Sequence, residues 1–451
     1  MSALEKALKY SKKTGIDESE IVLIKKKITT VRITDSEIAE IKQNYDESYG
    51  VRLIHNKKII SLQTTNKREI EKTIGDAFLS IKKIKPREFW KELPDKIDSK
   101  KIKGTYDKNI EFISGKEATD IAQNMINSAK NSKIKAITGS LNIVHDDFEL
   151  ENSNGLNFKD KATYVSGIIN AESDDSIPVS GIGHSCCRTL ANFSPQQIGE
   201  DAKTMCLESI NPKRITSGKY DIIFEPYSVG ELLSFVLTSN FNMKTFSEKK
   251  SCFSNNLNKS IAVDELTVSD DPHIPEGIGT KAVDDEGIKT EKISYIDKGI
   301  FKNTFSNLFD SFKEEKHSTG NACRPGSPMG RSSDPIPIAA PHNIKISKGD
   351  WTQEELVKDT KQGLLVGRLW YTYAVNPIKG DFSCTARSGI RIVEDGEIKS
   401  AGRPFRIIHN LPIMLKNISG ICNNQTRVIQ WASLPSLAPS VRVQKISVNS
   451  I

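Results

Sequence analysis

Histidine and cysteine are the side chains of this chain that could bind a metal or act as nucleophiles. No histidine has another three, four or five positions away, the spacing at which a helix presents two imidazoles to one ion. The cysteines are odd in number, widely scattered and without a CxxC pair, which favours reduced buried thiols over a disulfide framework or structural zinc. The histidines are His55, His145, His184, His273, His317, His342 and His409, and the cysteines are Cys186, Cys187, Cys206, Cys252, Cys323, Cys384 and Cys422.

Two short stretches combine possible ligands. In the segment 145–147, His-Asp-Asp, neighbouring strand residues point to opposite faces, so we interpret it as a solvated turn. His184 precedes Cys186 and Cys187 and could bind a soft metal, but its strand-like surroundings favour core thiols. The same stretch resembles half of a nucleophile elbow but lacks the closing glycine.

The segment 317–325, which reads HSTGNACRP, differs from its surroundings because small polar residues flank a glycine and an arginine follows. Such a composition predicts an exposed loop rich in hydrogen bonds, and loops of this kind often meet a ligand or partner. We therefore take its polar members as a candidate substrate or partner loop. They are Ser318, Thr319, Asn321 and Arg324.

The C-terminal segment is expected to open with a strand over Tyr220–Phe224, followed by a helix from Val229 to about Ser239. Four residues of that helix share one apolar stripe and should pack inward. They are Leu232, Leu233, Val236 and Leu237.

The rest of the chain predicts a multi-domain α+β protein. Residues 1–84 read as an N-terminal domain of helices and antiparallel strands, 85–104 as a basic linker, and 105–216 as a central α+β domain. Residues 217–451 read as a C-terminal domain dominated by antiparallel strands, because short apolar runs alternate there with Gly, Pro, Asn and Asp. Hairpin turns are expected at residues 56–58, 285–287 and 394–396.

Composition excludes several classes of protein. A hydrophobic fraction of 37%, a charged fraction of 27% and a net charge of +7 over 451 residues are typical of a soluble globular chain. No apolar run is long enough for a membrane span and the N-terminus has no signal-peptide core, so we expect a cytoplasmic protein. The basic linker contains aromatic residues, but no stacking platform accompanies them, so nucleic-acid binding is the weaker reading.

Five ordered strings resemble the TldD/PmbA metallopeptidase family. They are the segments 217–226 (SGKYDIIFEP), 283–290 (VDDEGIKT) with 296–300 (IDKGI) after it, 318–324 (STGNACR), 376–383 (NPIKGDFS) and 393–398 (VEDGEI). Each string is weak alone, whereas their order is specific.

The resemblance implies a cytosolic metallopeptidase built from two chains, in which the TldD-type chain carries His-Glu-x-x-x-His after the opening strand and a late cysteine. In this sequence the motif is replaced by the segment 234–239, SFVLTS. Ser234 and Ser239 occupy the positions of the two histidines, and Phe235 occupies that of the glutamate. Trp431 stands near the cysteine position. The chain therefore resembles the PmbA (TldE) type, the arm without a metal site.

Three functions follow as hypotheses. In the first, the chain is a non-catalytic subunit without a cofactor of its own, which binds unfolded or short peptides and encloses a chamber. Its partner is a TldD-type chain that holds zinc, and a homodimer is possible in isolation. In the second, it is an independent metallopeptidase with other ligands, for example His317, Cys323, Cys384 or His409. In the third, it binds nucleic acid through the basic linker.

Overall fold

The computed structural model describes residues 2–98, 100–174, 177–429 and 434–451. Long strands with apolar residues on both faces form one six-stranded antiparallel sheet in the order β3-β2-β1-β4-β5-β6. Its strands are β1 (Glu18–Thr34), β2 (Glu37–His55), β3 (Lys58–Thr64), β4 (Ala136–Asn152), β5 (Asn157–Ser173) and β6 (Val179–Cys187).

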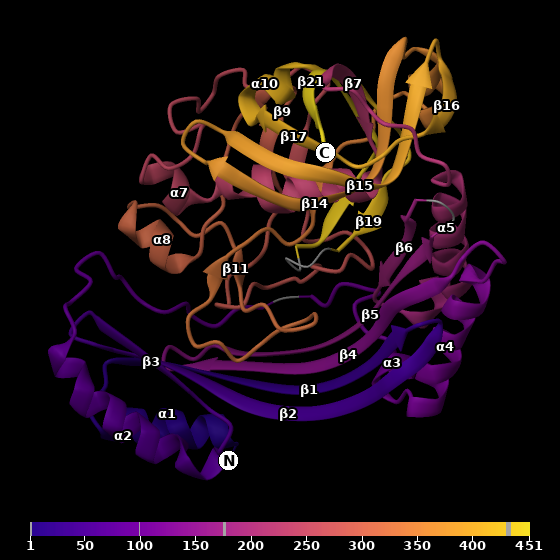
Figure 1. The fold of residues 1–451 in the computed structure, drawn as a ribbon. Helices are drawn as coiled ribbons and strands as arrows, with labels where there is room; N and C mark the ends of the chain where they lie inside the picture. The colour runs from indigo at the N-terminus through magenta and orange to yellow at the C-terminus, as the bar shows by residue number, and fades with distance from the viewer. Residues whose placement is uncertain (1, 99, 175–176, 430–433) are drawn as a thin grey trace.

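Helices cover one face of this N-terminal sheet, and the C-terminal part of the chain lies against the other. Figure 1 shows the strands curving beneath the C-terminal elements, with α1 and α2 outside one end and α4 and α5 outside the other. The helices here are α1 (Ala3–Lys13), α2 (Ile70–Ser80), α3 (Lys108–Glu111), α4 (Gly115–Ala129) and α5 (Pro195–Glu208). Ser2 and Ser114 begin α1 and α4 with capping boxes, so both starts are encoded locally.

Strand β1 pairs with β4, from Glu20–Asn152 to Ile33–Gly139. This pairing connects the regions 1–84 and 105–216, which the sequence analysis assigns to different domains. The predicted division between 1–84 and 105–216 therefore does not separate two sheets. The boundary near residue 217 stays a prediction. Strand β2 runs without interruption from Glu37 to His55, and β4 runs from Ala136 to Asn152. The polar middle of β2 is paired with β1 along its length.

The C-terminal half contains a closed barrel of five strands, in the order β14-β7-β21-β17-β15 and back to β14. These are β7 (Gly218–Phe224), β14 (Gln362–Asn376), β15 (Asp381–Glu394), β17 (Phe405–Asn410) and β21 (Val441–Ser450), with β16 (Glu397–Ala401) and β18 (Ile418–Ile421) attached. Only β7 and β14 run parallel within the ring, so the predicted dominance of antiparallel strands is confirmed for this region.

Shorter strands form a second C-terminal sheet in the order β10-β9-β8-β13-β20-β19. They are β8 (Val268–Asp270), β9 (Ile293–Asp297), β10 (Ile300–Phe301), β13 (Ile344–Ile346), β19 (Thr426–Val428) and β20 (Ser436–Ala438), while β11 (Ala322–Cys323) pairs with β12 (Ile338–Ala339). The remaining helices are α6 (Pro226–Leu232), α7 (Met243–Ser247), α8 (Leu308–Lys313), α9 (Gln353–Lys358) and α10 (Leu411–Lys416).

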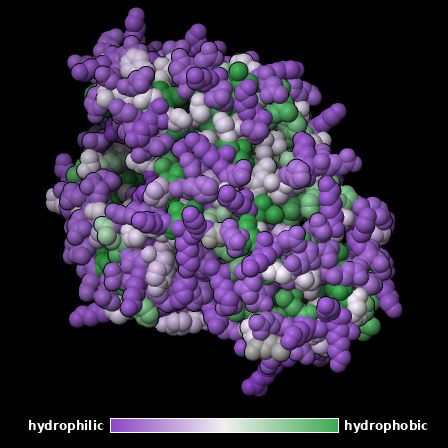
Figure 2. Space-filling model, turned by 180° about the vertical axis from the view of Figure 1, so that it is seen from behind, coloured by the Kyte–Doolittle hydropathy of each residue, from purple (hydrophilic) through white to green (hydrophobic). Residues whose placement is uncertain are grey.

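Two of the predicted turns are confirmed as two-residue hairpins. Asn56 and Lys57 have φ of 49° and 57°, and Asp395 and Gly396 have φ of 50° and 79°, which matches the left-handed pair of a type I′ turn. The face seen in Figure 2 is mostly hydrophilic with apolar residues interspersed. Within the described ranges, no helix combines the length and apolar character needed to cross a bilayer.

Candidate functional site

The helix after β7 is regular only in its first part. Pro226 occupies the first turn of α6, a π turn follows over Leu233–Leu237, and a 3₁₀ turn covers Thr238–Phe241. The backbone N–H of Thr238 donates to the carbonyl of Leu233, and its Oγ1 donates to the same oxygen at 2.7 Å. These two hydrogen bonds from Thr238 to a residue five positions earlier account for the wide turn. Such π turns are frequently found at functional positions.

The predicted motif positions lie in this irregular region. The Oγ of Ser234 is buried and finds no hydrogen-bond partner among the described residues, whereas Ser239 is exposed. Phe235 is half-buried and packs against the apolar core. Trp431 lies outside the described residues.

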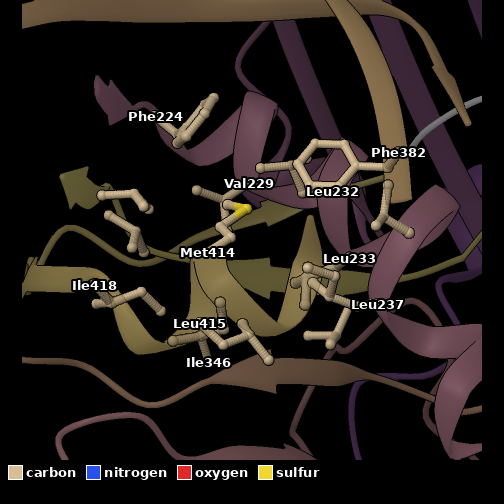
Figure 3. Close-up of a cluster of buried hydrophobic side chains, with 14 of the residues drawn as sticks. Phe224, Val229, Leu232, Leu233, Leu237, Ile346, Phe382, Met414, Leu415 and Ile418 are labelled. Carbon is tan, nitrogen blue, oxygen red and sulfur yellow. The ribbon is translucent and has the colours of Figure 1, made fainter. Parts of the chain in front are cut away.

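The opposite face of the same helix is a packing face. Leu232, Leu233, Val236 and Leu237 are all at most 7% exposed, which confirms the predicted inward stripe. Figure 3 shows Leu232, Leu233 and Leu237 gathered with residues of β7, β13, β15, β18 and α10. Those from α6, β7, β13 and α10 line a small apolar cavity of about 40 Å³. The helix is therefore held by the packing of this apolar stripe in the core. Residues 234 and 239 are not part of the stripe.

These side chains do not suit zinc. A zinc ion in a protein takes thiolate, imidazole or carboxylate ligands, and a water on it needs a base nearby. Serine hydroxyls at positions 234 and 239 offer neither a thiolate nor an imidazole, and Phe235 cannot accept a proton. The residues present therefore do not fit the family's metal motif.

Glu231 is a buried carboxyl group one turn before Ser234 that the sequence reading missed. Its Oε2 accepts the backbone N–H of Leu369 at 2.6 Å, which joins α6 to β14. Burial raises the pKa of Glu231 to about 8, with the Leu369 hydrogen bond and Arg368 acting in the opposite direction. The feature of the sequence that could have indicated Glu231 is a single carboxylate within an otherwise apolar stretch.

The loop at 317–325 is exposed only in its first part. His317 is exposed and Ser318 and Thr319 are half-buried, but Asn321 and Arg324 are fully buried, so the expectation of an exposed loop is wrong for these two. Asn321 donates through Nδ2 to Asp270 at 2.8 Å and so ties the loop to β8. A binding role for Ser318 and Thr319 stays a prediction.

Arg324 belongs to a buried ionic cluster that joins the C-terminal loops to the N-terminal sheet. Its Nη2 lies 2.5 Å from Glu20 of β1, and Glu20 also pairs with Arg52 of β2 at 2.7 Å. Arg52 in turn pairs with Glu286 at 2.7 Å. All four side chains are at most 3% exposed. Charges this deep are tolerated because each has an opposite partner and hydrogen bonds.

A second group of charges lies beside the first. Arg331 bonds to Asp285 at 3.0 Å and to Asp160 of β5 at 2.8 Å, and Lys281 also pairs with Asp285. Burial by itself would raise the pKa of Asp285, but Lys281 and Arg331 hold it well below its ordinary value. The expected turn at 285–287 is present, with Gly287 at φ +91°, but it is buried within this network instead of forming a solvated hairpin.

The residues named for an independent metal site do not come together. Cys384 points into the barrel and is fully buried, His409 lies on β17 against the ring of Phe382, and His317 is exposed. Cys323 is on β11. Across the described parts of the chain, no group of three or more His, Cys, Asp or Glu side chains is arranged to hold an ion.

The basic linker does not present its aromatic residues to solvent. Trp90 is 2% exposed, donates through Nε1 to Glu18 at 3.0 Å, and packs edge-on against Phe312 of α8. Phe89 packs against Phe309 of the same helix. Since these rings are engaged by protein, they offer no platform for stacked bases.

Comparisons with known proteins agree with this architecture. The family model described as PmbA/TldA metallopeptidase C-terminal domain matches residues 217–450, and the model for domain 1 of that family matches residues 19–80. A metalloprotease PmbA homologue of Buchnera aphidicola is 25% identical over 449 residues, covering 95% of this chain and 93% of the relative. An uncharacterised protein of Methanocaldococcus jannaschii is 26% identical over 381 residues, with coverages of 84% and 86%.

A solved structure shares the whole fold. TldE from Thermococcus kodakarensis superimposes with a TM-score of 0.88 at 20% sequence identity, covering 99% of this chain and 100% of that one. The family model spans more than half of the chain, and the hairpin expected at 394–396 is present within the recognised string at 393–398. This chain belongs to the PmbA/TldD family of metallopeptidases.

Proposed function

We propose that this chain is the subunit without a metal site of a two-chain peptidase, in which a TldD-type partner holds the zinc. The observation that carries the proposal is the segment 234–239, where hydroxyl and phenyl groups occupy the positions of the family's ligands and base. The surrounding packing supports it, because Phe235 is engaged with the core and Ser239 points to solvent.

The contribution of such a subunit would be to bind unfolded or short peptides and to close the chamber around the partner's metal. Extended peptides bind along sheet edges through main-chain hydrogen bonds, with little selectivity for sequence. An edge of this kind exists on β2, where β3 covers only Tyr49–His55 and leaves residues 37–48 paired on one side alone. This edge supports a role in peptide binding.

The test compares three samples, each with and without chelator: the chain alone, a TldD-type relative alone, and the mixture. We expect cleavage of an unstructured peptide only in the mixture, and we expect chelator to abolish it. Metal analysis of the purified chain should find no stoichiometric zinc. Chelator-sensitive cleavage by the chain alone would overturn the proposal, and His317, Cys323, Cys384 and His409 would then be the first positions to substitute.

A further inference from the structure

A cavity of about 400 Å³ lies where the edge of the N-terminal sheet meets the C-terminal half of the chain. Figure 1 shows β6 at this edge, between α5 and β19. Asp201, Thr204 and Glu208 of α5 are exposed and lie at the rim, so the cavity is open to solvent there. Its volume is typical of sites that hold small ligands, and no residue of the segment 234–239 lines it.

Strand β6 presents an open edge to this cavity. It pairs with β5 on one side, and no strand of the described residues pairs with it on the other. At the open edge the backbone N–H of Ile182 donates to the Sδ of Met205 at 3.4 Å. A thioether is a weak acceptor and the methionine side chain adapts easily, so an oxygen atom of a ligand can replace it at this N–H.

His184, two residues further along β6, carries a second group that the fold does not use. Its Nε2 is buried and makes no hydrogen bond with any described residue. The ring lies edge-on to that of Tyr227, with 5.2 Å between the ring centres, which positions it against the start of α6. Burial lowers the pKa of His184 to about 4, so the imidazole is neutral at neutral pH and its Nε2–H tautomer can donate. Buried polar atoms in native folds nearly always have a partner, and a bound ligand would supply one here.

Two arginines bring further donors to the wall of the cavity. Arg391 of β15 pairs with Glu208 at 3.0 Å and with Glu225 at 2.5 Å, but its Nε is buried and has no hydrogen-bond partner among the described residues. Arg427 of β19 donates to the carbonyl of Pro275 at 3.4 Å. No carboxylate in the described parts of the chain lies within ion-pair distance of Arg427, so its charge is not neutralised by any of them.

We propose that this cavity binds a short peptide through its C-terminal carboxylate, with Ile182, His184, Arg391 and Arg427 as the recognising residues. The groups left over in the cavity are all hydrogen-bond donors, so the ligand that fits them supplies acceptor oxygens. A peptide terminus has a charged carboxylate for the guanidinium groups and a neighbouring carbonyl oxygen for the open strand edge. Hydrogen bonds from arginine to a carboxylate are among the strongest that proteins make.

The rim of the cavity favours a peptide over other anions. Asp201 and Glu208 are acidic and exposed there, so they repel a phosphate ion but attract the cationic amino end of a peptide. The limited volume restricts the ligand to a few residues.

This site belongs to the chain itself and needs no partner subunit, so the inference does not depend on the proposed function. The two are chemically compatible, because each cleavage of a peptide bond produces a fragment with a new free carboxylate.

Isothermal titration calorimetry of the purified chain with the tripeptide Ala-Ala-Ala tests the ligand chemistry. We expect one peptide to bind per chain, and the C-terminal amide of the same peptide to bind at least about tenfold more weakly, because amidation removes the charged acceptor. Acetylation of the amino end removes only an attraction at the exposed rim, so it should weaken binding by no more than about fivefold. Acetate and inorganic phosphate lack the peptide backbone and should each bind at least about tenfold more weakly than the tripeptide.

Substitutions in the cavity test its location. Arg427→Gln should weaken binding of Ala-Ala-Ala about tenfold or more, and His184→Phe about three- to tenfold, because the first removes a charged donor and the second a neutral one. Phenylalanine keeps a ring against Tyr227. The matched control is Arg68→Gln, an exposed arginine outside the cavity, which should change the affinity less than about twofold. Far-UV circular dichroism and thermal midpoints verify folding, and the comparison of acid with amide decides the proposal even where a variant does not fold.

Several results would overturn the inference. They are the absence of binding at about 10 mM tripeptide, equal affinity for the acid and the amide, and unchanged affinity in both Arg427→Gln and His184→Phe. Acetate or phosphate that binds as tightly as the tripeptide would assign the cavity to a simple anion and refute the peptide ligand. None of these results bears on the proposed function, which the cleavage assay with the TldD-type relative decides separately.

Discussion

Replacing Arg324 by methionine should destabilise the protein by about 3–5 kcal/mol, because the change leaves buried carboxylates with too little positive charge. Arg324 is fully buried, lies 2.5 Å from Glu20, and donates through Nε to the carbonyl of Asp285 at 3.0 Å. Two unit charges 4 Å apart interact by about 4 kcal/mol at an effective dielectric constant of 20. Methionine preserves most of the aliphatic volume, so the loss is chiefly electrostatic.

A double-mutant cycle tests this reasoning. Urea unfolding followed by tryptophan fluorescence and circular dichroism compares Arg324→Met, Glu20→Gln and the double variant. Removing the Glu20 charge should be less costly in the Arg324→Met background than in the wild type, with a coupling free energy of about 1–3 kcal/mol. Trp90 is a useful probe because the Arg52 guanidinium lies 5.5 Å from the centre of its ring.

Arg68→Met is the matched control, since Arg68 is exposed and should change stability by no more than about 0.5 kcal/mol. The reasoning is refuted if Arg324→Met unfolds within about 1 kcal/mol of the wild type. It is also refuted if the effects of Arg324→Met and Glu20→Gln simply add, because a shared ionic cluster requires them to couple.

Three further predictions concern the candidate site. Leu233→Ala should lower the free energy of unfolding by about 2–5 kcal/mol, because it opens a cavity in the core. Ser239 is exposed, so Ser239→Ala should have little effect on this free energy. Urea titration of both variants measures the difference. Ser234→His should not confer zinc binding or cleavage, since one imidazole leaves the other ligands and the base absent; stoichiometric zinc in the purified variant would contradict this. The Glu231 carboxyl has a pKa raised to about 8, so its contribution to stability is fully present below the unfolded pKa near 4.5 and is lost as the pH rises through 8. Glu231→Gln should therefore gain stability relative to the wild type between pH 5 and pH 9 by a few kcal/mol at most, and a pH-independent difference would show that the carboxyl is not protonated in the folded protein.

Local patterns in the sequence were sufficient for individual elements. The inward stripe of the helix from Val229 follows from residue spacing, which depends on the helical repeat alone. Turns such as Asp395-Gly396 follow from residues that tolerate positive φ. The family strings in the C-terminal half were also readable, because each is a short contiguous segment and their order along the chain is fixed.

The joining of these elements required the tertiary structure. Glu20 and Arg324 are 304 positions apart, and nothing in either neighbourhood indicates that the two charges meet in the interior. The same holds for β1 and β4, whose pairing joins residues 18–34 to residues 136–152, and for Trp90, which is buried although it lies in a segment read as a basic linker. Short-range patterns in the sequence indicated several individual elements and the resemblance to the family, since both depend on residues close together in the chain. The tertiary structure decided which polar residues are buried and which apolar ones are exposed, because burial is set by contacts between distant segments.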